Sequence, residues 1–238
     1  MSTQAKEGRK MSEPICIVGD SITGGVVYLE DSERYARCKD SFVNLLGGAL
    51  NAEMRNHSKF GLTSEAALRK LGRFEGDIAQ CPHTLVMLGG NDSDFDWPAV
   101  AETPEQPHDC NTPVSRFSEC YNAVLDRIIE LGSRPVVISL IPVWGRRYYE
   151  WFSRKLDGRA LMRFLGTTDS IEHWNEMYNL EVIKTAAKRE LPIIDVRSAF
   201  LSARDFTGLF SRDGIHPSPA GHRRMFEYSL PQLRAALG

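Results

Sequence analysis

The sequence predicts an α/β fold, namely a three-layer α/β/α sandwich around a central parallel sheet of about five strands. The first observation behind this prediction is that short apolar runs alternate along the chain with patterns typical of amphipathic helices. The second is that these runs are continuous, as in parallel strands that helices cover on both faces. The third is a length of 238 residues with no internal repeat or low-complexity linker, which fits one domain with a large core.

Four apolar runs are candidate strands, and three of them stop at residues that favour turns. The first run ends at Gly19, the second at Gly89-Gly90 and the third at Pro142. The four runs cover residues 15–18, 84–88, 135–141 and 191–196, and a weaker candidate covers residues 52–57. Ligands bind outside the carboxyl ends of parallel strands, so polar residues that directly follow the runs are candidates for a functional site.

Helical patterns fill the gaps between the apolar runs. The clearest begins at Thr112, a good N-cap, has Pro113 in the first helical position and is expected to end at Gly132. Inside it, apolar residues recur at steps of three or four positions, at Val114, Phe117, Tyr121, Val124 and Ile128. Further helices are predicted near residues 41–51, 63–72, 171–190 and 219–236. This alternation of strands and helices is typical of a doubly wound sheet.

Composition and charge argue against several kinds of partner. Apolar residues make up 42% of the chain and charged residues 25%, which is ordinary for a soluble globular protein. A net charge of −2 gives no reason to expect a nucleic acid or an anionic membrane surface as a partner. Residues 1–12 are polar, lack the apolar core of a secretory signal and are expected to form a flexible leader before a single domain at residues 13–238. No apolar run approaches the roughly 18 residues of a transmembrane helix, so no membrane span is expected.

The cysteines indicate a reducing compartment. There are five of them, with no C-x-x-C pair, at Cys16, Cys38, Cys81, Cys110 and Cys120. An odd number of scattered cysteines argues against a disulfide framework and against a zinc site. Free thiols in a cytoplasmic protein are therefore the expectation.

Polar residues follow the first two apolar runs directly. Asp20 and Ser21 stand on a turn after the first run, and a helix starting there would aim backbone N–H groups at a developing oxyanion. A serine that merely caps a helix explains this segment about equally well. Asn91 and Asp92 follow the second run, where the amide of Asn91 is a candidate oxyanion donor and a simple β-turn is the alternative.

Two further segments contain groups that a nucleophilic serine needs. Asp213 and His216 lie three positions apart on a predicted turn, so one loop could present a base together with the carboxylate that orients it. A surface turn rich in Asp, Gly and Pro is the alternative. Residues 56–64 contain Gly61 just before a helix expected to start at Thr63, and the Gly61 N–H could face the same pocket.

Taken in order, these four segments resemble the four sequence blocks of the SGNH/GDSL hydrolase family. Gly19-Asp20-Ser21 resembles the G-D-S block, and residues 56–64 resemble the block that contains the oxyanion-hole glycine. Gly89-Gly90-Asn91-Asp92 matches the G-x-N-D block, and residues 213–217 match the D-x-x-H-P block. The resemblance spans nearly the whole chain and implies the flavodoxin-like SGNH hydrolase fold.

The resemblance also implies a reaction, the cleavage of carboxylic esters by an esterase or lipase through an acyl-enzyme intermediate. Ser21 would be the nucleophile, His216 its base and Asp213 the residue that orients the base. The oxyanion hole would consist of the Ser21 N–H, the Gly61 N–H and the side-chain amide of Asn91. A small-molecule ester, including an O-acetylated sugar, would be the substrate, and no metal or organic cofactor is implied.

Three other polar residues near these candidates are expected to have structural roles. Asp20 and Asp92 should accept hydrogen bonds from loop N–H groups instead of acting in catalysis. His222, on the last predicted helix, should pack or cap instead of serving as a second base.

The aromatic-rich segment at residues 143–178 is longer than an ordinary connection between a strand and a helix. It follows the third apolar run, so it emerges beside the predicted site. One interpretation is a cap or pocket wall that binds the substrate, with Trp144 and, from another segment, Trp97 as candidate contacts. The other is an extra helical hairpin that packs on the main core or forms a contact in a homo-oligomer.

Alternative functions follow from the same residues. Among ester hydrolases, a lysophospholipase or thioesterase competes with a small-acyl esterase. Transfer of the acyl group to an alcohol instead of water is a further alternative. A metal-dependent hydrolase is a second class, although the spacing of its candidate ligands matches no known motif; these are Asp20, Asn91, Asp92, His216 and His222. An inactive carbohydrate-binding relative is a third, and the joint presence of all the catalytic candidates argues against it.

Overall fold

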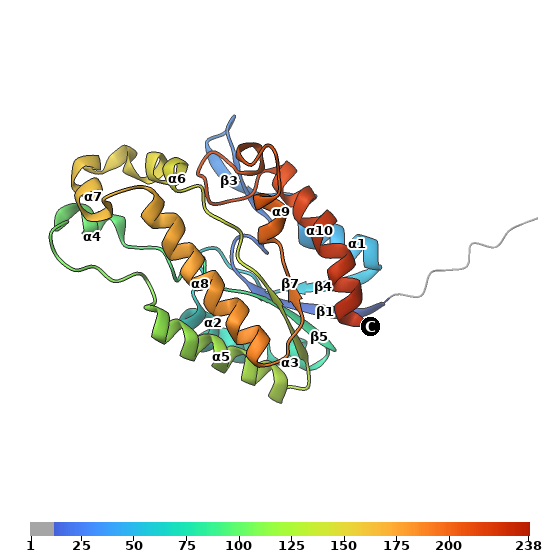
Figure 1. The fold of residues 1–238 in the computed structure, drawn as a ribbon. Helices are drawn as coiled ribbons and strands as arrows, with labels where there is room; N and C mark the ends of the chain where they lie inside the picture. Colours follow the sequence, from blue (N-terminus) through green and yellow to red (C-terminus); the bar gives the residue numbers. More distant parts are fainter. Residues whose placement is uncertain (1–11) are drawn as a thin grey trace, which may run out of the picture.

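The computed structural model describes residues 12–238, and within them five parallel strands form the central sheet (Figure 1). The strand order is β4-β1-β5-β6-β7, and every pairing is parallel. The strands are β1 (Ser12–Gly19), β4 (Ala52–Asn56), β5 (His83–Met87), β6 (Arg134–Ile138) and β7 (Ile193–Ile194). The predicted sandwich and its five strands are confirmed. The predicted leader lies outside the described residues, apart from Ser12, which begins β1.

The strand order places the change of winding direction at β1. The chain leaves β1 toward its neighbour β4 on one side, whereas it leaves β5, the neighbour on the other side, toward β6 and the opposite edge of the sheet. In doubly wound sheets the crevice at this switch point lies outside the carboxyl ends of the two central strands. Ser21 follows β1 and Asn91 follows β5, so the fold alone brings both residues to that crevice.

Helices cover both faces of the sheet (Figure 1). On one face α1 (Phe42–Leu50) packs against α10 (Pro219–Leu237), and α9 (Arg197–Leu201) also contacts α10. On the other face α5 (Val114–Glu130) packs between α2 (Ser64–Lys70) and α8 (Asp169–Lys188). A 3₁₀ turn (Leu71–Arg73) links α2 to the short α3 (Glu75–Ala79).

The ends of several helices follow the signals in the sequence. The Thr63 hydroxyl accepts a hydrogen bond from the N–H of Ala66 at 3.3 Å and caps α2, as expected of an N-cap threonine. Helix α5 begins one residue later than predicted, because Pro113 occupies its N-cap position and Thr112 makes no cap bond. It ends just before Gly132, whose φ of +83° breaks the helix.

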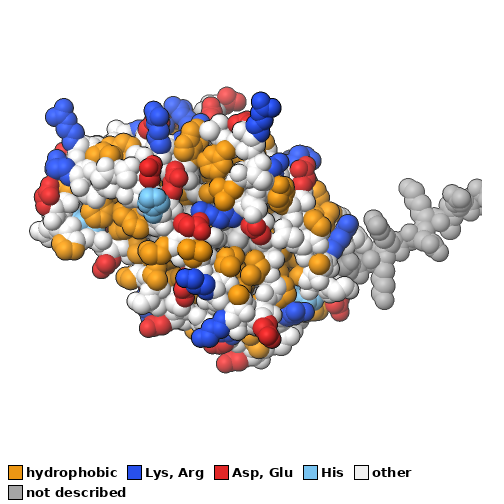
Figure 2. All heavy atoms as spheres, viewed as in Figure 1, with side chains coloured by type: hydrophobic (Ala, Val, Ile, Leu, Met, Phe, Trp, Pro, Cys, Tyr) orange, Lys and Arg blue, Asp and Glu red, His pale blue; other side chains and the backbone are white. Residues whose placement is uncertain are grey.

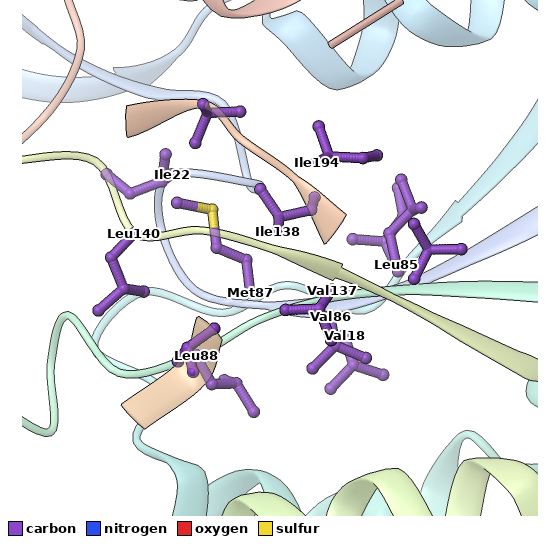
Figure 3. Close-up of a cluster of buried hydrophobic side chains, with 14 of the residues drawn as sticks. Val18, Ile22, Leu85, Val86, Met87, Leu88, Val137, Ile138, Leu140 and Ile194 are labelled. Carbon is purple, nitrogen blue, oxygen red and sulfur yellow. The ribbon is translucent and has the colours of Figure 1, made fainter. Parts of the chain in front are cut away.

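The core lies between the sheet and its two helical layers. Figure 3 shows side chains from three neighbouring strands meeting there, among them Val18, Leu85 and Val137. Each of these three is at most 1% exposed, because helices cover both faces of the strands. On the face drawn in Figure 2, by contrast, charged side chains of both signs are scattered between apolar ones.

One expectation about the nucleophile segment is wrong, since no helix starts directly after Ser21. Residues 21–25 form a tight turn in which Gly24 N donates to Asp20 O at 2.9 Å. Gly25 then takes a φ of +72°, which ends any helical path. The chain continues instead into an antiparallel hairpin, β2 (Val26–Leu29) and β3 (Arg34–Arg37), which the sequence analysis did not predict.

The segment at residues 143–178 forms a small helical layer of its own at one end of the sheet (Figure 1). It contains α6 (Gly145–Phe152), a 3₁₀ turn (Ser153–Lys155), α7 (Gly158–Leu165) and the first half of α8. Together with α4 (Trp97–Glu102) and its flanks, it encloses a second hydrophobic cluster separate from the main core, which includes Phe95, Trp97, Val100, Tyr148, Leu161, Leu165 and Ile171.

Two further observations concern sequence predictions. No helix within residues 12–238 is long and apolar enough to cross a membrane. All five cysteines are free thiols.

Candidate active site

Ser21, His216 and Asp213 meet at the crevice beyond the carboxyl end of β1. Ser21 Oγ lies 2.8 Å from His216 Nε2, and His216 Nδ1 lies 2.6 Å from Asp213 Oδ2. Ser21 is 6% exposed, His216 2% and Asp213 0%, so the chain of hydrogen bonds is almost shielded from solvent. The geometry is that of a nucleophile, a base and an orienting carboxylate.

The loop that presents Asp213 and His216 is fixed by its own backbone. Asp213 Oδ1 accepts hydrogen bonds from the N–H groups of Ile215 at 3.1 Å and His216 at 3.0 Å, which leaves Oδ2 for the imidazole. Gly214 has a φ of +78°, and a Cβ there would lie 2.8 Å from Tyr148 N, so a glycine is needed. Burial acts to raise the pKa of Asp213, but the hydrogen bonds and charge of His216 outweigh it and hold that pKa below its ordinary value.

The turn that presents Ser21 is held by Asp20. Asp20 Oδ1 accepts a hydrogen bond from Ile22 N at 2.9 Å, and the Thr23 hydroxyl donates to the Asp20 carbonyl at 3.2 Å. Gly19 permits this close turn, because a Cβ there would lie 2.2 Å from Thr23 Oγ1. Burial raises the pKa of the Asp20 carboxyl to about 6.

The three expected oxyanion donors gather around Ser21 to different degrees. Asn91 Nδ2 donates to Asp20 Oδ2 at 3.2 Å and to the Leu62 carbonyl at 3.3 Å, two long hydrogen bonds that hold the amide beside the nucleophile. Among the described residues, no protein acceptor takes the backbone N–H of Ser21 or of Gly61. Gly61 has a φ of +69° and follows Phe60, which lines the cavity in front of Ser21, although Gly61 itself does not.

Asp92 joins the loop after β5 to the start of α2. Its carboxylate accepts hydrogen bonds from the N–H of Ser64 at 2.9 and 3.0 Å and from the Ser64 hydroxyl at 2.6 Å. Asp20 thus accepts a hydrogen bond from a loop N–H group, as expected, whereas Asp92 accepts from the first N–H group of α2. His222 is also buried as expected, with its ring stacked on Phe42 at 6.1 Å.

A cavity of about 380 Å³ opens in front of Ser21. Eleven of the side chains that line it are aromatic or aliphatic: Ile22, Tyr35, Phe60, Met87, Leu140, Ile141, Val143, Tyr148, Trp151, Phe152 and Ile215. The polar residues in the wall are Asp20, Ser21, Gly90, Asn91, Ser93, Asp94, Asn175 and His216. A mostly apolar concave site with a few polar groups is the usual form of a pocket for a small molecule.

Two aromatic side chains that the sequence did not point to lie against the imidazole of His216. The ring of Tyr35, from β3, lies 5.1 Å from that of His216, and the ring of Phe60 lies 5.6 Å from it at an interplanar angle of 21°. Phe60 is 61% exposed, which is unusual for a side chain of that size. Tyr35 was missed because the hairpin that carries it was not predicted from the sequence.

Neither tryptophan expected at the substrate lines the cavity. The Trp97 indole stacks on Phe152 at 4.1 Å and donates through Nε1 to Asp94 Oδ1 at 2.9 Å, so it supports two lining residues from behind. Trp144 lies under the guanidinium of Arg147 at 3.7 Å. Trp151 and Phe152, from α6, occupy the wall instead. Within residues 12–238, no three or more His, Cys, Asp or Glu side chains gather in a way that could hold a metal ion.

Comparisons with known proteins concern the sequence family and the fold. The family model of the GDSL-like lipase/acylhydrolase family matches residues 17–224. The fold is similar to that of a lipase/acylhydrolase from Enterococcus faecalis, with a TM-score of 0.68, 18% identity, and 94% of this chain and 96% of that chain covered.

Two other solved structures have the same fold. For a carbohydrate acetylesterase family member from Sinorhizobium meliloti the TM-score is 0.65 at 16% identity, covering 95% of this chain and 100% of that chain. For the psychrotrophic esterase EstA from a Pseudoalteromonas species, inhibited by monoethylphosphonate, the TM-score is 0.61 at 16% identity. That comparison covers 95% of this chain and 99% of that chain. The comparison with curated proteins found no match.

Proposed function

The chain belongs to the GDSL-like lipase/acylhydrolase family, and on that premise we propose that it is a serine hydrolase that cleaves carboxylic esters through an acyl-enzyme intermediate. One observation carries the proposal, the continuous chain of hydrogen bonds from Ser21 Oγ through His216 to Asp213. Burial of all three residues beside a cavity of substrate size supports it.

In the proposed reaction, Ser21 Oγ attacks the ester carbonyl carbon and gives its proton to His216 Nε2. Asp213 keeps the proton on Nδ1 and stabilises the imidazolium. The carbonyl oxygen becomes an oxyanion that accepts hydrogen bonds from the N–H groups of Ser21 and Gly61 and from the Asn91 amide. His216 then returns the proton to the leaving alcohol, and a water molecule, activated in the same way, releases the acid.

The cavity wall gives the segment at residues 143–178 a role in this proposal. Tyr148, Trp151 and Phe152 of α6 form one side of the cavity, so α6 acts as a wall for the substrate. The volume of about 380 Å³ suits a small ester better than a long acyl chain in its full length. We place the enzyme in the cytoplasm, because five free thiols fit a reducing compartment.

The test is covalent labelling by a fluorophosphonate, with mass spectrometry to locate the adduct. We expect one adduct, on Ser21, together with hydrolysis of p-nitrophenyl acetate that persists in EDTA. Ser21→Ala should abolish both the adduct and the hydrolysis. Ser93→Ala is the matched control, because Ser93 also lines the cavity but donates to the Gly90 carbonyl at 3.0 Å and has no base beside it.

Two results would contradict the proposal. One is an adduct on a residue other than Ser21. The other is hydrolysis that EDTA abolishes, which would favour the metal-dependent alternative.

A further inference from the structure

The wall of the cavity contains a hydrogen-bond donor that no protein group uses. Asn175, on α8, is 3% exposed, and its Oδ1 accepts a hydrogen bond from Arg197 Nη1 at 2.9 Å. That bond fixes the orientation of the amide, because only the oxygen can accept from a guanidinium. Within the part of the chain that the structure describes, Nδ2 has no acceptor, although Asn175 lines the cavity. The amide N–H₂ of a buried residue in the cavity wall is therefore free to donate to a ligand.

The same cavity contains a carboxylate that the proposed reaction does not use. Asp94 lies in the loop after β5, and each of its oxygens accepts one hydrogen bond, from Trp97 Nε1 at 2.9 Å and from the Tyr148 hydroxyl at 2.6 Å. No cationic side chain among residues 12–238 forms an ion pair with it. A carboxylate has about four acceptor sites, so Asp94 can still accept a hydrogen bond from a ligand.

The two groups together favour one kind of ligand group. A hydroxyl can donate to Asp94 and accept from Asn175 Nδ2. An ammonium group offers no acceptor to Asn175, so it would leave the amide N–H₂ without a partner. A carboxylate or phosphate would be repelled by Asp94. A wholly apolar group would strip water from both polar groups without replacing its hydrogen bonds.

We propose that Asp94 and Asn175 form a polar subsite that recognises a hydroxyl group of the ester substrate within the otherwise apolar cavity. The inference rests on the proposed function, since the subsite serves the ester that Ser21 attacks. The hydroxyl can come from the acyl chain, as in a hydroxyacyl ester, or from the alcohol, as in an acetylated sugar. Both sources present the same chemistry to the subsite.

The first test compares matched substrates with the wild-type protein. One pair is p-nitrophenyl 3-hydroxybutyrate and p-nitrophenyl butyrate, which differ in an acyl hydroxyl. The other is a monoacetylated methyl xyloside and cyclohexyl acetate, which differ in the hydroxyls of the alcohol. We expect kcat/KM to favour the hydroxylated member of one pair by about tenfold or more, because a buried site built for a hydroxyl rejects an analogue that lacks it.

The pair that shows the preference identifies the source of the hydroxyl. If neither pair shows it while the plain esters are hydrolysed, the subsite is overturned and the proposed function stands. If the protein hydrolyses no ester in either pair, the proposed function fails and the subsite fails with it.

The second test is Asn175→Asp, which keeps an oxygen for Arg197 but replaces the free donor with an acceptor. We expect the preference for the hydroxylated substrate to fall at least fivefold. Asn179→Asp is the matched control: Asn179 lies on the same helix, is 5% exposed, and its Oδ1 accepts from Leu140 N at 3.1 Å without lining the cavity. The Asn179→Asp variant should prefer the hydroxylated substrate as strongly as the wild type does.

Fluorophosphonate labelling of Ser21 checks that each variant is folded. An unchanged preference in labelled Asn175→Asp, or an equal loss in Asn179→Asp, would overturn the subsite. If Asn175→Asp does not fold, the comparison of wild-type substrates decides alone.

Discussion

The side-chain amide of Asn91 donates to the carboxylate of Asp20 at 3.2 Å, which links the loops that follow β5 and β1. Asp20 immediately precedes the proposed nucleophile, so one carboxylate holds both the turn of Ser21 and the amide beside it. The amide also donates to the Leu62 carbonyl at 3.3 Å, so in the proposed reaction the oxyanion replaces one of two long hydrogen bonds. The amide is thus prepositioned while its bonds are weak enough to exchange.

Asn91→Ala should lower kcat about a hundredfold with a smaller change in KM, because the amide donates more strongly to the oxyanion than to the ground-state carbonyl. Steady-state kinetics on p-nitrophenyl acetate measure both constants. Fluorophosphonate labelling of Ser21 supplies the control for folding. An unchanged kcat would remove Asn91 from the oxyanion hole.

Asp213→Asn should lower kcat by about 10⁴-fold without unfolding the loop. An asparagine keeps one oxygen for the backbone N–H groups of Ile215 and His216, as Asp213 Oδ1 does now. Its amide nitrogen then faces His216 Nδ1 and favours the wrong tautomer. The measurements are kcat and the thermal unfolding midpoint, and a loss of less than about tenfold in kcat would argue that Asp213 does not orient the base.

Gly61→Ala should destabilise the protein by about 1 kcal/mol, because a side chain is strained at a φ of +69° even though a Cβ there meets no atom within 4 Å. We also expect kcat to fall about tenfold as the N–H turns away from the oxyanion. Gly48→Ala is the control: Gly48 lies within α1, a Cβ there also meets nothing within 4 Å, and alanine should stabilise the helix by about 0.5–1 kcal/mol. Urea unfolding measures the free energy of unfolding of both variants. Equal changes in that free energy would contradict the role assigned to the positive φ of Gly61.

His222→Gln tests the acid sensitivity of the fold. Burial lowers the pKa of His222 to about 4, and its Nδ1 has no hydrogen-bond partner among the residues from Ser12 onward. The neutral ring therefore contributes stability that is fully present above the ordinary histidine pKa of about 6.5 and is lost as the pH falls through about 4. Between pH about 6.5 and about 4, the free energy of unfolding of the wild type should fall by up to roughly 3 kcal/mol more than that of the variant. Parallel pH dependences of urea unfolding would show that His222 is not the group responsible.

The strands and the main helices could be predicted because local sequence decides them. Continuous apolar runs identified four of the five strands, and β4, whose sequence is mixed, was only a weaker candidate. Thr63 as an N-cap placed the start of α2, and Gly132 as a helix stop placed the end of α5, each within a residue or two. The meeting of Ser21 with Asn91 followed from topology, because each stands directly after a central strand. These inferences needed no knowledge of side-chain packing.

The cavity wall could not be predicted in the same way. Tyr35 reaches His216 only because Gly24 and Gly25 divert the chain into a hairpin, and four-residue strands leave little periodic signal. Trp97 was expected at the substrate because it follows the G-x-N-D block. It does not line the cavity, and it lies behind Asp94 and Phe152, which do. Which aromatic side chain faces a cavity depends on helix rotation within the segment at 143–178, and composition does not encode that rotation.

Ser21 and His216 are 195 positions apart in the chain, yet Ser21 Oγ and His216 Nε2 form a hydrogen bond of 2.8 Å. During synthesis Ser21 therefore leaves the ribosome early, and His216, its proposed base, follows only after nearly all of the domain. Since α10, just beyond His216, packs against α1 near the start of the chain, the two ends of the sequence must close one large loop before the site exists. Such long-range closure slows folding. A nascent or truncated chain that ends before Asp213 has a serine without a base, so hydrolytic activity reports the completion of the fold.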